Sequence, residues 1–312
     1  MQRCIYVFLD GVGLAEAASH NPFTPYNPTE TLESGSDIQP APFLATLLGG
    51  PLLAGLEVQT PQLLFKAIDA QLGVPGRPQS STGQTSLYTG RNAQQVLGRH
   101  LTGFTNGSLR TLLEESGIFK QVLALGGTVT LANVYHPAYF EAVEQSQGRL
   151  RYAVGTLLAL TAGIPFRMPT DLERGEALFW DITNEHLGQR NIEAPVITPA
   201  EAGRRLAQLG TQHNLTLFEC FLPDYAGHDQ DLEQARSVIS ILDSFFEGLF
   251  ASVEPDITVV VCSDHGNIED LSQKIHTFNP VPLLVKGPGA VAFVDITNIA
   301  QLTPTIVNLL QS

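Results

Sequence analysis

Three short apolar runs along the chain each lead to an aspartate. They span residues 4–9, 215–222 and 257–263, and the aspartates are Asp10, Asp224 and Asp264. Apolar runs of this length, bounded by turn residues, are typical of strands that are buried on both faces. The pattern therefore predicts a sheet of buried strands, each of which delivers a carboxylate at its end.

The segments between these runs have helical spacing of their apolar residues. Residues 231–251 and 199–209 follow this pattern, and the second segment begins at a proline, which is favoured in the first turn of a helix. Strand, helix and strand in this order predict an α/β fold with a mostly parallel sheet covered by helices on both faces. Ligands of such sheets bind beyond the carboxyl ends of the strands, so we expect the three aspartates to share one crevice.

The middle of the chain has a different composition. Residues 100–198 are interrupted by Gly and Pro and contain few lysines but six arginines: Arg110, Arg149, Arg151, Arg167, Arg174 and Arg190. We interpret residues 1–99 and 199–312 as a metal-binding catalytic core and residues 100–198 as an inserted cap domain. The arginines of this cap could contact phosphate or carboxylate groups, although a solvated basic face explains each of them as well.

Composition narrows the partners. The 312 residues are 43% hydrophobic and carry a net charge of −14, which argues against binding to nucleic acid or anionic lipid and favours a small substrate. An anionic substrate would then need bound metal ions to invert the local negative field. Three unclustered cysteines suit a reducing compartment, and there is no apolar run of membrane-spanning length. We therefore expect a cytoplasmic protein without a membrane partner.

The candidate metal ligands are three carboxylates and three imidazoles. Asp224 is followed four residues later by a histidine, Asp264 is followed directly by one, and a third histidine precedes a Pro-bounded strand; these are His228, His265 and His276. Taken singly, such residues can also be explained as helix caps, turn residues or surface histidines. Together with Asp10 they form a mixture that binds Mn²⁺ or Zn²⁺, and Mg²⁺ is also compatible. Six ligands predict two ions, about 3.5–4 Å apart.

A hydroxyl-rich segment at residues 78–85 supplies candidate nucleophiles. It contains Ser80, Ser81 and Thr82 just before a predicted helix, so helix capping is one explanation of the cluster. The functional alternative is a hydroxyl that metal coordination activates for attack. Spacing alone does not choose among the three.

The order of these motifs resembles the alkaline phosphatase superfamily, and within it the metalloenzyme branch of cofactor-independent phosphoglycerate mutase and phosphopentomutase. The motifs are Asp-Gly near the N-terminus, the hydroxyl loop, Asp-x-x-x-His, Asp-His-Gly-Asn and His-x-x-Asn-Pro-Val-Pro, over about residues 1–95 and 205–312. The resemblance implies that Ser80 is the nucleophile. It also implies one metal held by Asp224, His228 and His276, and another held by Asp10, Asp264, His265 and Ser80.

The chain departs from both mutases beside the nucleophile. Gln84 stands where they carry His, and Ser81 stands where they carry an acidic residue, whereas Gly90-Arg91 falls where the phosphoglycerate mutases have Gly-Arg. Gln84 and Arg91 are therefore the candidate substrate contacts.

The resemblance implies a two-metal enzyme that transfers the phosphoryl group of a small phosphorylated metabolite through a phosphoserine, as a phosphomutase or a phosphatase. The alternatives are a phosphodiesterase or sulfatase on the same core, or a metal-binding protein without catalysis.

Overall fold

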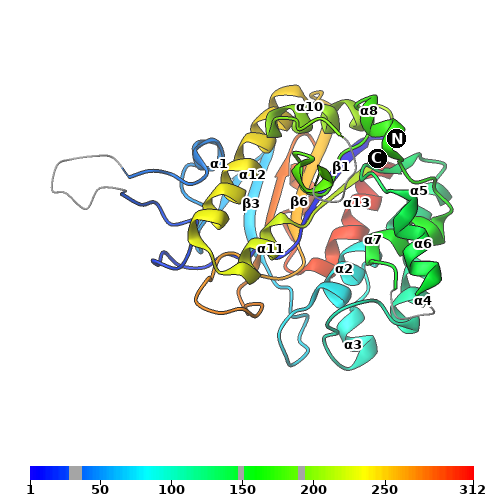
Figure 1. The fold of residues 1–312 in the computed structure, drawn as a ribbon, viewed down its shortest axis with the longest axis horizontal. Helices are drawn as coiled ribbons and strands as arrows, with labels where there is room; N and C mark the ends of the chain where they lie inside the picture. Colours follow the sequence, from blue (N-terminus) through cyan, green and yellow to red (C-terminus); the bar gives the residue numbers. More distant parts are fainter. Residues whose placement is uncertain (28–36, 147–150, 189–193) are drawn as a thin grey trace.

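The computed structural model describes residues 1–27, 37–146, 151–188 and 194–312 and contains one seven-stranded sheet (Figure 1). The strand order across the sheet is β2-β3-β7-β6-β1-β5-β4. The strands are β1 (Arg3–Leu9), β2 (Val58–Thr60), β3 (Leu63–Ile68), β4 (Val129–Leu131), β5 (Leu215–Cys220), β6 (Ile257–Ser263) and β7 (Val281–Lys286). The three strands expected from the apolar runs lie side by side at its centre.

The sheet is mostly parallel, as predicted, but two strands run against the others. β1 is parallel to β5 and β6, and β4 is parallel to β5. β7 is antiparallel to both β6 and β3, and β2 is antiparallel to β3. The loop at residues 264–280 therefore leaves β6 and enters β7 at the same edge of the sheet, without a crossover.

Helices cover both faces of the sheet (Figure 1). One face packs against α1 (Pro42–Leu48), α10 (Pro199–Gly210) and α12 (Leu232–Ser252). The other packs against α2 (Ser80–Thr89), α4 (Gly107–Ser116), α5 (Ile118–Ala124), α7 (Val154–Ala162) and α13 (Leu302–Gln311). Side chains of β1 alternate between the two cores: Ile5 and Val7 enter the first, Tyr6 and Phe8 the second. This alternation is the two-residue period of a strand buried on both faces.

The remaining helices are short. They are α3 (Ala93–Leu97), α6 (Pro137–Gln145), α8 (Pro169–Glu173), α9 (Glu185–Gly188) and α11 (Leu222–Asp229), with the 3₁₀ turns Ala290–Phe293 and Ile299–Gln301. Capping defines the starts of the two predicted helices. The Thr198 hydroxyl accepts from the N–H of Glu201 at the start of α10, and Asp231 accepts from the N–H groups of Glu233 and Gln234 at the start of α12.

The segment predicted as a cap is partly built into the sheet. β4 pairs with β5 at the edge of the sheet, and α4, α5 and α7 pack on the same face as α2 and α13. Buried residues of α4, α5, β4 and α7 therefore share a core with residues of the N- and C-terminal parts, whereas the division at residue 99 stays a prediction. Two small clusters are separate from the two cores: one contains Val134, Leu172, Ala177, Phe179 and Leu187, and the other joins Leu109 and Leu112 to Ala93.

Two expectations from composition concern the cysteines and membrane-spanning helices. Cys4, Cys220 and Cys262 are buried and free of disulfides. Over the part of the chain that the structure describes, no helix has the length and apolar character needed to cross a membrane.

Candidate metal centre

The predicted ligands converge at the carboxyl edge of the central strands. Asp10 follows β1, Asp264 follows β6, and Asp224 lies in the first turn of α11, just after β5. β5, β1 and β6 are neighbours and run parallel, so their ends bring the three carboxylates to one place. His276 reaches the same edge because β7 is antiparallel and begins there.

The first group of possible ligands is Asp224, His228 and His276, whose donor atoms all lie within 4.8 Å of one another. Asp224 Oδ2 is 3.3 Å from His228 Nε2, and Asp224 Oδ1 is 3.6 Å from His276 Nε2. Asp224 and His228 are four residues apart on α11 and therefore project from the same side of the helix. His228 is exposed, so this group opens toward solvent.

The second group is Asp10, Asp264 and His265, again with donor atoms within 4.8 Å of one another. His265 Nε2 lies 3.3 Å from Asp10 Oδ1 and 3.5 Å from Asp264 Oδ2. All three residues are buried. The two groups adjoin, because the His265 and His276 rings stack with centroids 3.7 Å apart.

Each histidine is oriented by a backbone carbonyl at its other ring nitrogen. His228 Nδ1 is 2.8 Å from the carbonyl oxygen of Lys274, His276 Nδ1 is 3.0 Å from that of Pro78, and His265 Nδ1 is 3.4 Å from that of Gly266. A carbonyl only accepts, so each Nδ1 donates to its carbonyl, and Nε2 is the ring nitrogen that faces the carboxylates and that could bind a metal ion once it has lost its proton. This is the arrangement that orients histidines bound to metals.

The pKa values of the aspartates and histidines in the two groups are shifted by burial and by the neighbouring charges. Burial raises the pKa of Asp10 and Asp264 well above the usual range, and each is raised further by a neighbouring aspartate. Burial also lowers the pKa of His276 to about 4. The hydrogen bond to Asp224 raises the pKa of His228 to about 9, whereas the pKa of Asp224 is lowered, because its hydrogen bonds to His228 and Asn267 outweigh its burial.

The donor set fits two divalent cations of the borderline class. Among the described residues, the buried Oδ1 of Asp10 accepts no hydrogen bond, which is costly unless a cation compensates. Two groups of mixed imidazole and carboxylate donors suit Mn²⁺ or Zn²⁺. The two groups of three possible ligands lie side by side, as a pair of ions would require.

The structure distinguishes among the three hydroxyls of the candidate nucleophile segment. Ser80 is the first residue of α2, and its Oγ lies 2.9 Å from His265 Nε2. The Ser81 hydroxyl instead donates to the carbonyl of Gly103, and the Thr82 hydroxyl donates to the carbonyl of Gln79. Of these three, only Ser80 contacts the ligand cluster through its hydroxyl.

The two candidate substrate contacts are placed differently. Gln84 is buried one turn after Ser80, and its Nε2 is 3.4 Å from Asp264 Oδ2. Arg91 is exposed beyond the other end of α2. Ten helical residues separate it from the cluster by roughly 15 Å of rise, so the structure does not bring Arg91 to the candidate metal centre.

The described cap arginines contact other parts of the protein. Arg110 pairs with Glu114, Arg174 with Asp171 and Glu176, Arg151 donates to the carbonyl of Thr105, and Arg167 donates to the hydroxyl of Thr130. Arg149 and Arg190 lie outside the described residues. The structure thus places none of these four arginines against the predicted ligands.

Sequence reasoning missed two residues that hold the ligand loops. The buried carboxylate of Glu269 accepts from the N–H groups of Gly13 and Asn267, from the Thr277 hydroxyl and from the Asn279 amide, and so ties the loops after β1 and β6 together. Asn267 donates to Asp224 Oδ1 at 2.7 Å. Asn267 belongs to the Asp-His-Gly-Asn motif, which was a usable signal, whereas the role of Glu269 depends on contacts between distant segments.

Gly11 allows the loop after β1 to approach α11. Its φ is +73°, and a Cβ there would lie 2.7 Å from Asp224 Oδ1 and 2.9 Å from Asp224 Cα. We expect Gly11→Ala to weaken metal binding, measured by calorimetric titration, and to cost about 2 kcal/mol of stability or more.

The matched control for Gly11→Ala is Gly98→Ala. Gly98 has a φ of +69° but nothing within 4 Å of an added Cβ. This variant should lose about 1 kcal/mol through backbone strain and retain metal affinity. Equal metal affinities of the two variants would contradict the steric explanation.

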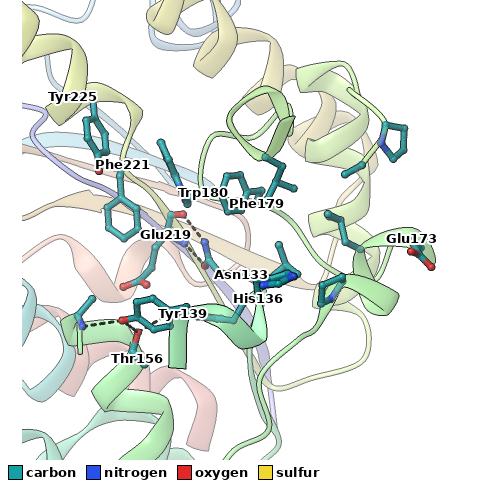
Figure 2. A pocket seen from close by; sticks show the side chains of 18 residues that line it. Asn133, His136, Tyr139, Thr156, Glu173, Phe179, Trp180, Glu219, Phe221 and Tyr225 are labelled. Carbon is teal, nitrogen blue, oxygen red and sulfur yellow. Dashed lines mark hydrogen bonds between the residues drawn. The ribbon is translucent and has the colours of Figure 1, made fainter. Parts of the chain in front are cut away.

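Another buried acid, Glu219 on β5, was also missed (Figure 2). It is 1% exposed, it accepts a hydrogen bond of 2.7 Å from the Tyr88 hydroxyl, and burial raises its pKa from 4.5 to about 7. The folded state therefore binds the carboxyl proton of Glu219 more tightly than the unfolded state does. Because the unfolded state loses this proton first, the free energy of unfolding falls as the pH rises from about 4.5 to 7, by about 3 kcal/mol in total.

We therefore expect Glu219→Gln to remove this part of the pH dependence. Urea unfolding of the metal-free protein at pH 5 and pH 8 should show about 3 kcal/mol less loss in Glu219→Gln than in the wild type. Glu141→Gln makes the same charge change at an exposed position of α6 and should behave as the wild type. An unchanged pH dependence in Glu219→Gln would show that Glu219 does not titrate in this range.

Comparisons with known proteins identify relatives of this chain. Residues 198–312 match the family model of the Metalloenzyme superfamily. The 2,3-bisphosphoglycerate-independent phosphoglycerate mutase of Cereibacter sphaeroides is 30% identical over 133 residues, 39% of this chain and 26% of the mutase. The mutase of the same description from Yersinia pestis is 28% identical over 127 residues, 38% of this chain and 25% of that protein. The chain therefore matches about a quarter of the length of these relatives.

Two solved structures share the fold over nearly the whole chain. The cold-active alkaline phosphatase of Shewanella sp. superposes with a TM-score of 0.56 at 14% identity and covers 99% of this chain and 100% of its own. The phosphoglycerate mutase of Leishmania mexicana superposes with a TM-score of 0.50 at 11% identity, over 99% and 95%. The resemblance inferred from the motifs is confirmed: residues 198–312 match the Metalloenzyme superfamily, and the chain has the α/β fold of the alkaline phosphatases.

Proposed function

We propose that this protein is a metal-dependent phosphoryl-transfer enzyme that acts on a small phosphomonoester with Ser80 as nucleophile. The observation that carries the proposal is the position of the Ser80 hydroxyl, 2.9 Å from His265 Nε2 and beside two adjoining groups of three possible metal ligands. A two-metal site of this donor type is suited to in-line displacement at phosphorus.

The residues that would hold the ions are those of the two groups. Asp224, His228 and His276 would hold one, and Asp10, Asp264 and His265 the other, with Ser80 as a further ligand. The bound cations would neutralise charge on the phosphoryl group and lower the pKa of the Ser80 hydroxyl.

The chain itself positions the nucleophile and the phosphoryl group. Ser80 begins the ten-residue helix α2, whose first N–H groups have no partner within the helix and would be available to a phosphoryl group beside Ser80. The Ser80 Oγ–P bond forms as the ester P–O bond breaks, and the proton lost by Ser80 balances the proton gained by the leaving alcohol. Attack of water on the phosphoserine then releases phosphate and restores the hydroxyl.

The contacts of the cap favour water, rather than the dephosphorylated substrate, as the acceptor of the phosphoryl group from phosphoserine. A mutase must retain its dephosphorylated substrate, which takes anion-binding groups that close over it. The described cap arginines contact carboxylates, carbonyls or a hydroxyl of the protein instead. This supports hydrolysis over isomerisation, with phosphodiester and sulfate ester cleavage as the competing reactions of the same core.

The test is an assay of the purified chain after reconstitution with Mn²⁺, Zn²⁺ or Mg²⁺ separately. Phosphomonoesters, including phosphoglycerates and sugar phosphates, a phosphodiester and a sulfate ester are compared for release of inorganic anion and for isomer formation. Metal-dependent phosphate release from a monoester is the expected result. Isomer formation without free phosphate would establish a mutase, and inactivity with every metal and ester would overturn the proposal.

A further inference from the structure

The Glu269 carboxylate is buried in the loop between β6 and β7 and belongs to neither ligand group. Its Oε2 accepts from the N–H groups of Gly13 at 2.9 Å and Asn267 at 2.8 Å. Its Oε1 accepts from the Thr277 hydroxyl and, at 3.0 Å, from the Asn279 amide. All four contacts are with donors, so both oxygens act as the acceptors of a carboxylate.

The four donors are neighbours of the predicted metal ligands along the chain. Each stands within three residues of one: Gly13 of Asp10, Asn267 of His265, and Thr277 and Asn279 of His276. The Asn267 side chain adds the remaining segment, because its Nδ2 donates to Asp224 Oδ1 at 2.7 Å. One carboxylate therefore connects the segments that carry the ligands of both groups.

The carboxylate is tightly enclosed. An added Cβ on Gly13 or Gly266 would collide with it, and the neighbouring residues Asn267 and Thr277 are buried. Glu269 itself is 0% exposed, so bulk water does not solvate its charge. A charge in such surroundings interacts more strongly with its neighbours than the same charge would in water.

Within the described ranges, Glu269 forms no ion pair with a basic residue of the protein. The ion pairs around it involve other acids, namely Asp10, Asp224, Asp264 and Asp270. Burial of an unpaired charge is costly. Two divalent ions in the adjoining groups would compensate it: they bring four positive charges, the three ligand aspartates bring three negative ones, and Glu269 supplies the fourth.

We propose that Glu269 is a positioning residue for both metal ions, which holds the segments that carry their ligands and balances their charge without binding either ion. Residues that contact metal ligands in this way typically contribute about 10–100-fold to metal affinity. The inference rests on the two ligand groups assigned under the proposed function, but not on Ser80 or on the reaction. A residue that only braced the loops would affect the free energy of unfolding and leave the metal affinity of the folded protein unchanged.

Glu269→Gln tests this directly, because it keeps the shape of the side chain and removes its charge. The metal-free full chain is titrated with Mn²⁺ and with Zn²⁺ in a calorimeter, at a temperature at which circular dichroism shows that the variant is folded. We expect the Kd of both ions to rise about tenfold or more. Unchanged Kd values, or a rise confined to one ion, would overturn the proposal. If the wild type itself bound neither metal, the ligand groups of the proposed function would fall with it.

The matched control is Asp270→Asn, which removes the same charge from the next residue. Asp270 accepts from the N–H and hydroxyl groups of Ser272 and from the Gln273 amide, all within its own loop, and asparagine retains an acceptor for them. The Kd of both ions should remain close to that of the wild type. A rise equal to that in Glu269→Gln would show that the net charge of the loop is responsible, and not the position of Glu269.

A second pair of variants tests the same connection even if Glu269→Gln does not fold. Thr277→Val removes the hydroxyl that donates to Glu269 and should raise the Kd about fivefold, whereas Thr277→Ser keeps the hydroxyl and should bind metal as the wild type does. Combined with Glu269→Gln, Thr277→Val should produce little further rise, because its effect passes through the carboxylate. Equal Kd values for Thr277→Val and Thr277→Ser would contradict this route.

Discussion

Ser80→Ala is expected to lower metal-dependent phosphoryl transfer by about 10³-fold or more, because it removes the atom that forms the bond to phosphorus. The helix start and both ligand groups are left in place. Stability should therefore change little, since Ser80 is half-buried and, within the described part of the chain, its hydroxyl hydrogen-bonds to His265 alone. The measurement is the initial rate of phosphate release at saturating metal.

The matched control is Ser81→Ala. This neighbour is buried, and its hydroxyl donates to Gly103 rather than to the ligand cluster. It should cost some stability through the lost hydrogen bond, about 1 kcal/mol, and leave most of the activity. Mass spectrometry of acid-quenched reactions should find phosphate on the peptide that contains Ser80. Activity retained in Ser80→Ala, or lost equally in Ser81→Ala, would exclude Ser80 as the nucleophile.

Metal binding is expected to stabilise the folded chain by about 4 kcal/mol at a metal concentration near one thousand times the Kd. Asp264→Asn should abolish most of this gain, because it removes a ligand of the buried group. Without metal the same substitution should not destabilise the fold. Burial and the charge of Asp10 raise the pKa of Asp264, so replacing the carboxyl by a neutral amide relieves repulsion. Asp264→Asn is therefore expected to make the protein less stable than the wild type only when metal is present.

Asp243→Asn is the control for the metal experiment. Asp243 is also buried, but it lies on α12 and accepts from the N–H groups of Phe43 and Leu44 at the start of α1. Its variant should be less stable both with and without metal and should keep the same metal-induced gain. Urea unfolding with and without Mn²⁺ or Zn²⁺ measures all three proteins. An undiminished gain in Asp264→Asn would show that the ions bind elsewhere.

The general plan of the fold was accessible from local patterns. Apolar runs and helical spacing located β1, β5, β6, α10 and α12 to within a few residues. They did not reveal that β7 is antiparallel or that β4 joins the sheet from within the predicted cap. Strand direction and edge pairing depend on contacts between segments far apart in the chain, and β4 is three residues long, too short to produce a periodic signal.

The sequence by itself determined which residue types reach the end of each central strand, because an apolar run with a polar residue at its end specifies both the strand and its exit. It could not choose among Ser80, Ser81 and Thr82, place Gln84 near the cluster and Arg91 away from it, or indicate that Glu219 is buried. Only the tertiary structure decided these points. Each depends on which surfaces face each other after folding, and a buried carboxylate has its properties only once distant segments exclude water from it.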